Sequence, residues 1–246
     1  MKRVLTIAGS DPSGGAGVQA DMATFSAFNV KGLSAITAIT VQDTDSVKGL
    51  FAIPPPFVLQ QIETLVQACT IDAIKIGMLA KGEIVTAIAE LLNKLNLTTV
   101  VLDPVITSSS GFPLLEKRGI PALRELLPLV LIVTPNLHEA SLLTGREVVT
   151  EEDMGEAVIR IREMGPRYVL IKGGHLEGEA VDILYDGEEV KRYATERIGR
   201  GLHGTGCILS AALAACLAKG YNIERAVAES KVYVTSQISR AGSPDC

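Results

Sequence analysis

The stretch RVLTIAGSDPSGGAGVQAD, residues 3–21, joins a short apolar run to a glycine-rich loop and then to the start of a helical pattern. The apolar run at residues 3–8 predicts a buried strand, and residues 17–28 predict a helix. A strand that leads through a loop into a helix is half of a βα unit. Such units are typical of α/β proteins with a mostly parallel sheet.

The same alternation continues along the chain and predicts a series of βα units. Further strands are expected at residues 34–41, 73–76, 99–102, 129–133 and 168–171, with an antiparallel pair at 181–185 and 189–194. The dipeptide Asp186-Gly187 between the last two is a hairpin signal. Further helices are expected at residues 56–67, 83–95, 120–126, 151–164, 205–219 and 223–240. We expect one α/β domain over residues 1–246, since a chain of this length buries a substantial core.

Composition argues against nucleic-acid and membrane partners. The net charge is −5, there is no tryptophan, and no run of basic residues provides the clustered positive face that nucleic acids require. No apolar stretch reaches the roughly 18 residues of a membrane span, and the first apolar run is broken by Gly9 before it could form a signal peptide. We expect a cytoplasmic protein.

The four cysteines indicate neither a zinc site nor a disulfide framework. They stand at positions 69, 207, 216 and 246, without a C-x-x-C pair, and two of them fall on one predicted helix. A reducing compartment is the simpler interpretation.

The glycine-rich loop contains a formal dinucleotide-binding fingerprint, GAGVQA at residues 15–20, which matches G-x-G-x-x-G/A. Six residues separate the predicted strand from Gly15, whereas the fingerprint belongs in a tight turn. Asp21 would also set a carboxylate near the pyrophosphate, where like charges repel. A loop that closes over a small polar substrate fits better, and a loop whose glycines only permit tight packing is the alternative.

A second glycine-rich turn, HGTGCILSAAL at residues 203–213, opens directly into an alanine-rich helix. Such a turn leaves backbone N–H groups unpaired at the positive end of the helix dipole, which suits a phosphate. Cys207 stands on the first turn of that helix, close to whatever the phosphate reacts with. The sequence therefore predicts an anion hole with a thiol beside it.

Polar residues follow three of the predicted strands. Asp103, Asn136 and Glu139 offer oxygen ligands that suit a magnesium ion held partly through water. Asn136 and Glu139 also match a capping box, so helix capping is an alternative to metal binding, and the two roles can coexist. Lys172 stands at a strand end before two glycines, where a phosphate contact is expected.

Seven motifs in this order resemble the hydroxymethylpyrimidine and phosphomethylpyrimidine kinases of thiamine biosynthesis. They are GSDPSGGAGVQAD at 9–21, VQDT at 41–44, KIGML at 75–79, DPV at 103–105, TPNLHE at 134–139, KGGH at 172–175 and HGTGC at 203–207. The resemblance spans nearly the whole chain and implies a ribokinase-like fold, a three-layer α/β/α sandwich without the large β lid of sugar kinases. It also implies ATP and Mg²⁺ as cofactors and a homodimer.

The resemblance assigns roles to individual residues. It implies that Gln42 binds the aminopyrimidine edge, in a pocket completed by Asp21, Gly9, Met78 and Val105. It implies that Asp103 and Glu139 hold magnesium through water and that Lys172, Asn136 and Thr205 contact the nucleotide phosphates. The N–H groups of Gly204, Thr205, Gly206 and Cys207 would stabilise charge on the transferred phosphoryl group.

Cys207 occupies the position where most ribokinase-like enzymes carry an aspartate base, and members similar to this chain carry cysteine. A helix N-terminus favours a thiolate, so we expect Cys207 to accept the substrate proton near neutral pH. The alternative is a small residue beside the anion hole with no chemical role, because phosphoryl transfer depends mostly on positioning and electrostatics.

The sequence departs from the family pattern at several positions. Ser109 stands where members usually have lysine, and Asp43 replaces the more frequent asparagine. The segment before the anion hole is about one residue short and has Leu202 where threonine is typical. Arg200 would supply compensating charge or is a solvated surface residue.

Three functions remain open at this stage. The leading hypothesis is ATP-dependent phosphorylation of 4-amino-5-hydroxymethyl-2-methylpyrimidine and then of its monophosphate. A pyridoxal or pyridoxine kinase is the runner-up, although the Gln42 amide favours the pyrimidine. A catalytically silent nucleotide-binding or ligand-sensing protein is the third, and the joint presence of Asp103, Glu139, Lys172 and Cys207 argues against it.

Overall fold

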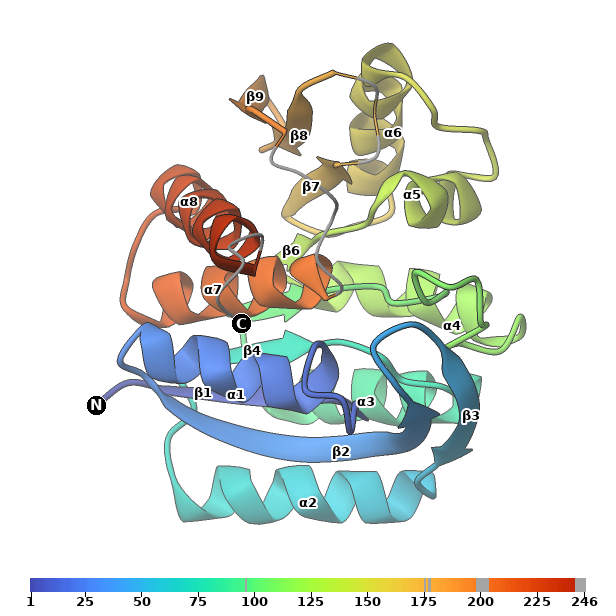
Figure 1. The fold of residues 1–246 in the computed structure, drawn as a ribbon. Coiled ribbons are helices and arrows are strands. Elements are labelled where there is room, and N and C mark those ends of the chain that lie inside the picture. The colour runs from blue at the N-terminus through green and yellow to red at the C-terminus, as the bar shows by residue number, and fades with distance from the viewer. Residues whose placement is uncertain (96, 175, 177, 198–203, 242–246) are drawn as a thin grey trace.

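A computed structural model of the chain describes residues 1–95, 97–174, 176, 178–197 and 204–241. These residues form a nine-stranded sheet with helices on both faces (Figure 1). The strands are β1 (Arg3–Ser10), β2 (Lys31–Gln42), β3 (Val47–Ala52), β4 (Ala73–Ile76), β5 (Val100–Leu102), β6 (Ile132–Val133), β7 (Tyr168–Gly173), β8 (Ala180–Tyr185) and β9 (Val190–Thr195). The helices are α1 (Gly17–Ala27), α2 (Pro55–Ala68), α3 (Gly82–Leu95), α4 (Gly119–Leu126), α5 (Leu137–Thr144), α6 (Glu151–Glu163), α7 (Thr205–Ala218) and α8 (Ile223–Ala241).

The sheet is parallel in its centre and antiparallel at both edges. Its order is β3-β2-β1-β4-β5-β6-β7-β8-β9, and every neighbouring pair from β2 to β7 is parallel. β3 pairs antiparallel with β2, and β8 and β9 form the expected antiparallel hairpin. The predicted fold class, a three-layer α/β/α sandwich with a mostly parallel sheet, is confirmed. Among the described residues, the strands outside the parallel core are β3 at one edge and β8 and β9 at the other, and they form no large lid.

Two hydrophobic cores lie on opposite faces of the sheet. One joins the strands to α2, α3, α4, α5 and α6, and the other joins them to α1, α7 and α8. Successive side chains of β4 point to opposite faces of the sheet. Ile74 and Ile76 therefore pack in the first core, whereas Ala73 packs in the second. Lys75 therefore points to the side of α1 and α7, although it lies in the middle of a buried strand.

The predicted elements agree with the structure except in three places. The strand expected at residues 129–133 is only Ile132–Val133, because Leu127–Leu129 form a 3₁₀ turn that contains Pro128. The strand β3 was not predicted. Neither was α5 as a helix, although its cap was recognised.

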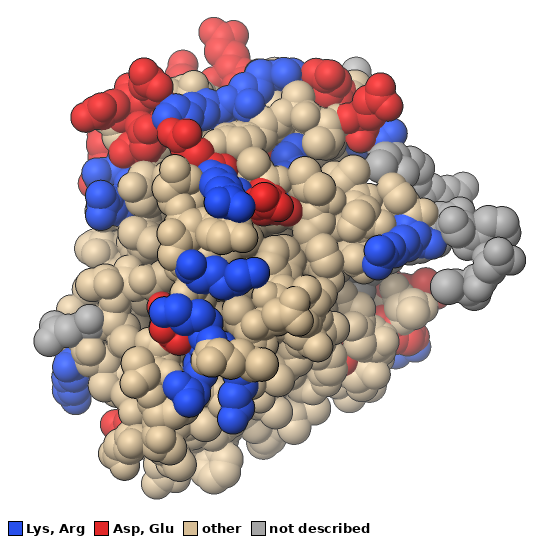
Figure 2. Space-filling view, turned by 90° about the vertical axis from the view of Figure 1, so that its left-hand side faces the viewer, with Lys and Arg blue, Asp and Glu red and all other residues tan. Residues whose placement is uncertain are grey.

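The surface drawn in Figure 2 carries charges of both signs. Most Asp and Glu side chains on this face gather along its upper edge, and Lys and Arg side chains lie among broad uncharged areas. The absence of a nucleic-acid partner stays a prediction. None of the described helices is both long and apolar enough to cross a bilayer.

Candidate active site

A cavity of about 590 Å³ opens at the carboxyl ends of the parallel strands. This is where ligands bind in open α/β sheets, because the loops that leave the strands converge there. The ends of β1, β2 and β4 form one side. The loops after β5, β6 and β7 and the first turn of α7 form the other.

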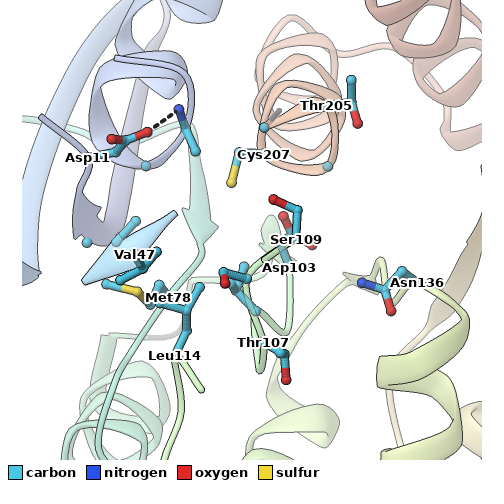
Figure 3. Close-up of a pocket in the computed structure, with 18 of the residues that line it drawn as sticks. Asp11, Val47, Met78, Asp103, Thr107, Ser109, Leu114, Asn136, Thr205 and Cys207 are labelled. Atoms are coloured by element: carbon cyan, nitrogen blue, oxygen red, sulfur yellow. Dashed lines mark hydrogen bonds between the residues drawn. The ribbon is translucent and has the colours of Figure 1, made fainter. Parts of the chain in front are cut away.

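The cavity has an apolar end and a polar end (Figure 3). Val47, Met78 and Leu114 line the apolar end, whereas Asn136 and Thr205 lie across from them. The side chains of Asp103 and Cys207 lie between these two groups, and the Cys207 sulfur points into the space. The cavity can thus hold an uncharged ring at one end and phosphates at the other.

Four residues predicted to bind the ring, Gly9, Gln42, Met78 and Val105, do line the cavity. A Cβ on Gly9 would lie 2.0 Å from the Met78 methyl carbon, so a side chain there would displace the end of Met78 from the pocket. The sequence reasoning missed Val47 and Leu114, which complete the apolar wall. The sequence carried no clear signal for Val47, because Lys48 and Gly49 interrupt the pattern of β3.

The two glycine-rich turns meet at the polar end. Gly204 has a φ of +83°, and a Cβ on it would lie 1.9 Å from the carbonyl oxygen of Gly15. Asp11 holds the first loop, because its carboxylate accepts from the N–H groups of Ser13 at 2.9 Å and Ala16 at 2.8 Å. The N-termini of α1 and α7 therefore both border the cavity. His203, which opens the predicted anion hole, lies outside the described residues.

Lys172 and Asp103, predicted for nucleotide and metal binding, form an ion pair. Lys172 Nζ donates to Asp103 Oδ1 at 2.6 Å, and Ser210 Oγ donates to Asp103 Oδ2 at 3.2 Å. Burial disfavours the charge of Asp103, but Lys172 and Lys75 outweigh it and lower the carboxyl pKa. A Cβ on Gly206 would lie 3.1 Å from Lys172 Nζ, so the ammonium lies beside the anion hole.

Asn136 and Glu139 form the capping box of α5. Asn136 Oδ1 accepts from the Glu139 N–H at 2.9 Å, and Glu139 Oε2 accepts from the Asn136 N–H at 2.8 Å. The capping interpretation is confirmed, and both residues also line the cavity. Burial raises the Glu139 pKa to about 7, against the attraction of Lys172.

The magnesium role of Asp103 and Glu139 stays a prediction, and the free lone pairs of both carboxylates suit an ion held through water. The described residues contain no group of three or more His, Cys, Asp and Glu side chains that could hold a metal. Asp103 and Glu139 already accept hydrogen bonds from protein donors. Their remaining lone pairs can accept from metal-bound water, the usual arrangement for Mg²⁺ with nucleotide phosphates.

Asp21 differs from its expected place in the ring pocket. It lies beneath the cavity without exposed surface, and its Oδ2 accepts from Thr6 Oγ1 at 2.6 Å and from Lys75 Nζ at 2.9 Å. Lys75, not Asp21, borders the cavity. The prediction missed Lys75, although a lysine inside the apolar run AIKIGML at residues 73–79 was a visible signal.

Cys207 lines the cavity as expected, and its role as a base stays a prediction. Burial raises the pKa of its thiol to about 11, against the attraction of Lys75 and an N–H hydrogen bond from Gly17. The helix N-terminus does not make a thiolate dominant at neutral pH in the ligand-free protein, because the cost of desolvating the charge is larger.

The departures from the family pattern are only partly visible. Ser109 lines the cavity from the loop after β5, with its side chain on the side of Cys207 (Figure 3). Asp43 does not line the cavity: its Oδ2 accepts from Lys48 and its Oδ1 accepts from the Ser46 N–H. Arg200 and Leu202 fall outside the described residues.

An α/β/α sandwich with a helix N-terminus, a lysine and two carboxylates around one cavity is typical of kinases with the ribokinase-like fold. The chain belongs to the phosphomethylpyrimidine kinase family, whose model matches residues 11–245. It is 46% identical over 241 residues to the hydroxymethylpyrimidine/phosphomethylpyrimidine kinase of Rhizobium meliloti, covering 96% of this chain and 90% of that protein. It also matches the thiamine biosynthesis bifunctional protein ThiED of Geobacter sulfurreducens, but covers only 49% of that relative's length.

Solved structures of two kinds of vitamin kinase share this fold. The phosphomethylpyrimidine kinase of Clostridium difficile 630 superimposes with a TM-score of 0.86 at 43% identity, over 97% of this chain and all of that chain. The ADP complex of Bacillus subtilis pyridoxal kinase gives 0.88 at 40% identity, over 96% of this chain and 90% of that one. Fold similarity thus does not separate the two substrate classes.

Proposed function

We propose that this protein uses ATP to phosphorylate 4-amino-5-hydroxymethyl-2-methylpyrimidine and then its monophosphate, giving the diphosphate used in thiamine biosynthesis. The observation that carries the proposal is the division of one cavity. Gln42, which pairs with Val47, and an apolar wall lie at one end, and the first turn of α7 lies with Lys172 at the other. Family membership supports the same reaction.

The ring end suits a methylated aminopyrimidine. Gln42 has an amide that can donate to a ring nitrogen and accept from an exocyclic amine. Val47, Met78 and Leu114 offer an apolar surface to the ring face and its methyl group. The hydroxymethyl group of a ring bound there would extend toward Cys207 and the anion hole.

The polar end suits the γ-phosphoryl group. We assign the N–H groups of Gly204, Thr205, Gly206 and Cys207 to the charge that develops on the phosphoryl oxygens. Lys172 and Asn136 then contact the nucleotide phosphates. In its thiolate form, Cys207 takes the acceptor proton and becomes the neutral thiol as the acceptor oxygen bonds to phosphorus and the bond to the ADP oxygen breaks. A bound Mg²⁺, held through water by Asp103 and Glu139, would neutralise phosphate charge.

One incubation tests the reaction. The protein is mixed with Mg-ATP and a panel of the pyrimidine alcohol, its monophosphate, pyridoxal and pyridoxine, and products are followed by mass. We expect both pyrimidine products, and a Cys207→Ala variant should lose at least about tenfold in turnover, in line with general-base contributions. Phosphorylation of no compound would overturn the kinase proposal and favour a silent nucleotide-binding protein. Near-normal turnover of Cys207→Ala would remove the base role.

Pyridoxal phosphorylation is the second candidate, supported by the similarity to the Bacillus subtilis pyridoxal kinase. A Gln42→Leu variant separates the candidates in the same panel. If the amide reads the aminopyrimidine edge, the variant loses pyrimidine turnover much more than any turnover of pyridoxal. Equal losses for both would remove the specificity assigned to Gln42.

We also propose a homodimer through the outer face of the β2–β3 ribbon. The side chains of Ile39, Val41 and Phe51 are each at least half exposed. Ile39 pairs with Phe51 across the two strands, and Val41 lies two residues from Ile39 on the same face of β2. The three side chains therefore form one apolar face. β3 is the edge strand of the sheet. A second copy of the same face would cover both the side chains and the edge, as two-fold symmetric interfaces do.

A further inference from the structure

A buried cation lies beneath the reacting end of the cavity, and the reaction as proposed gives it no role. Lys75 and Asp21 form an ion pair at 2.9 Å, and neither side chain has exposed surface. Thr6 Oγ1 also donates to Asp21, at 2.6 Å. Within the described residues, Asp21 is the only hydrogen-bond partner of the Lys75 ammonium, which has three donors.

Packing holds this ammonium in place. Lys75 extends from β4 toward α1 and α7, and a Cβ on Gly77 would lie 2.7 Å from its Nζ. Thr6 and Asp21 fix the other partner of the pair from β1 and α1. The charge therefore has a defined position under the cavity floor, which Lys75 borders.

Stability does not explain the pair. Burying two charges costs much of their mutual attraction, and apolar replacements of buried ion pairs are often neutral or stabilising. Asp21 Oδ1 is moreover buried without a hydrogen-bond partner in the described structure, which adds to the cost. A costly pair beside a reacting thiol is better explained by function.

The charges around Cys207 indicate which member of the Lys75–Asp21 ion pair acts on its sulfur. Lys75 is the strongest attraction for a thiolate at this position, whereas Asp103 and Asp21 oppose the thiolate more weakly. Lys172 and Cys207 also interact electrostatically, and the Gly17 N–H donates to the sulfur. The ion pair thus acts on Cys207 mainly through its positive end, and the carboxylate serves to hold Lys75 charged despite its burial.

We propose that Lys75, fixed by Asp21 and Thr6, is a positioning residue for phosphoryl transfer that directs positive charge at Cys207. The role rests on the proposed function, in which the sulfur takes the acceptor proton. The ammonium favours the thiolate before transfer, and the proton of the acceptor hydroxyl then neutralises it. Lys75 itself neither touches the acceptor nor exchanges a proton.

Alkylation of Cys207 tests the charge effect without turnover. The full chain is treated with iodoacetamide across pH 6–10, and mass spectrometry follows the peptide that carries Cys207. We expect Asp21→Asn with Lys75→Met to move the rate profile up by at least about one pH unit, a tenfold slower reaction at pH 8. Lys75→Met alone should move the profile in the same direction, because it removes the charge that attracts the thiolate.

A second buried pair supplies the matched control. Lys231 Nζ and Asp182 Oδ2 lie 2.6 Å apart between α8 and β8. Asp182→Asn with Lys231→Met removes the same two charges elsewhere and should leave the Cys207 profile unchanged. A wild-type profile in both Lys75 variants would overturn the proposal. If the double variant does not fold, an unchanged or faster Lys75→Met reaction overturns it.

Steady-state kinetics then test the positioning role of Lys75 separately from the proposed reaction. The pH profile of kcat with the pyrimidine alcohol should shift as the alkylation profile does, while KM for ATP stays within about twofold. A protein that phosphorylates nothing but shows the alkylation shifts would refute the function and keep the electrostatic effect. Shifted alkylation with an unshifted kcat profile would refute the positioning role alone.

Discussion

At the scale of single residues, burial determines the chemistry of the site more than residue type does. Glu139 illustrates this, because burial raises its pKa to about 7 from an ordinary value of 4.5. The folded protein thus binds this proton more tightly than the unfolded chain. The resulting stabilisation is fully present below about pH 4.5 and is lost as the pH rises through about 7.

A Glu139→Gln variant isolates this contribution. The amide oxygen can keep the capping bond to the Asn136 N–H but does not titrate. Between pH 5 and pH 8 we expect the wild-type free energy of unfolding to fall by about 1–3 kcal/mol more than that of the variant. Thermal and urea unfolding of the ligand-free proteins at equal ionic strength measure this, and parallel pH profiles would contradict it.

Sequence reasoning at this scale located side chains better than it assigned their states. The position of Cys207 in the cavity followed from its motif, but its thiol pKa depends on desolvation by elements distant in sequence. Asp21 and Lys75 fall in separate motifs, and only the packing of α1 on β4 reveals that they pair. The assigned roles of the site residues remain predictions.

At the scale of elements, the contact between two glycine-rich turns holds the polar end of the cavity together. Gly204→Ala would place a Cβ 1.9 Å from the Gly15 carbonyl oxygen, at a φ of +83° that disfavours side chains. We expect a loss of at least tenfold in kcat/KM, because the displaced turn no longer aims its N–H groups. Steady-state kinetics measure this. Gly220→Ala, at a similar φ of +86° but in open space, is the control.

Elements with strong local patterns were predicted and those that depend on partners were not. β4 was predicted residue for residue, because its apolar run ends at a glycine. β3 was missed, because Lys48 and Gly49 interrupt its pattern and only pairing with β2 makes it a strand. The meeting of Gly15 with Gly204 joins opposite ends of the chain and has no local signal.

At the scale of the whole molecule, the β2–β3 ribbon separates substrate from the proposed partner subunit. Thr40, Gln42 and Val47 face the cavity, whereas the alternating Ile39 and Val41 face outward. In a dimer formed on the outer face, the partner subunit would therefore pack against the strands that line the ring pocket and stabilise their position. Sequence patterning predicted the layers of the molecule but not this two-sided ribbon, because only β2 was recognised.

A pair of matched substitutions tests the dimer. Val41 on β2 is 64% exposed and Val232 on α8 is 65% exposed. In a monomer, an aspartate at either position would therefore be equally accessible to water. We expect Val41→Asp to yield a monomer at micromolar concentration, since it would bury an unpaired charge at the interface, and to raise KM for the pyrimidine several-fold. Val232→Asp should leave mass and kinetics unchanged. Light scattering after gel filtration measures the mass, and a dimeric Val41→Asp protein would place the interface elsewhere.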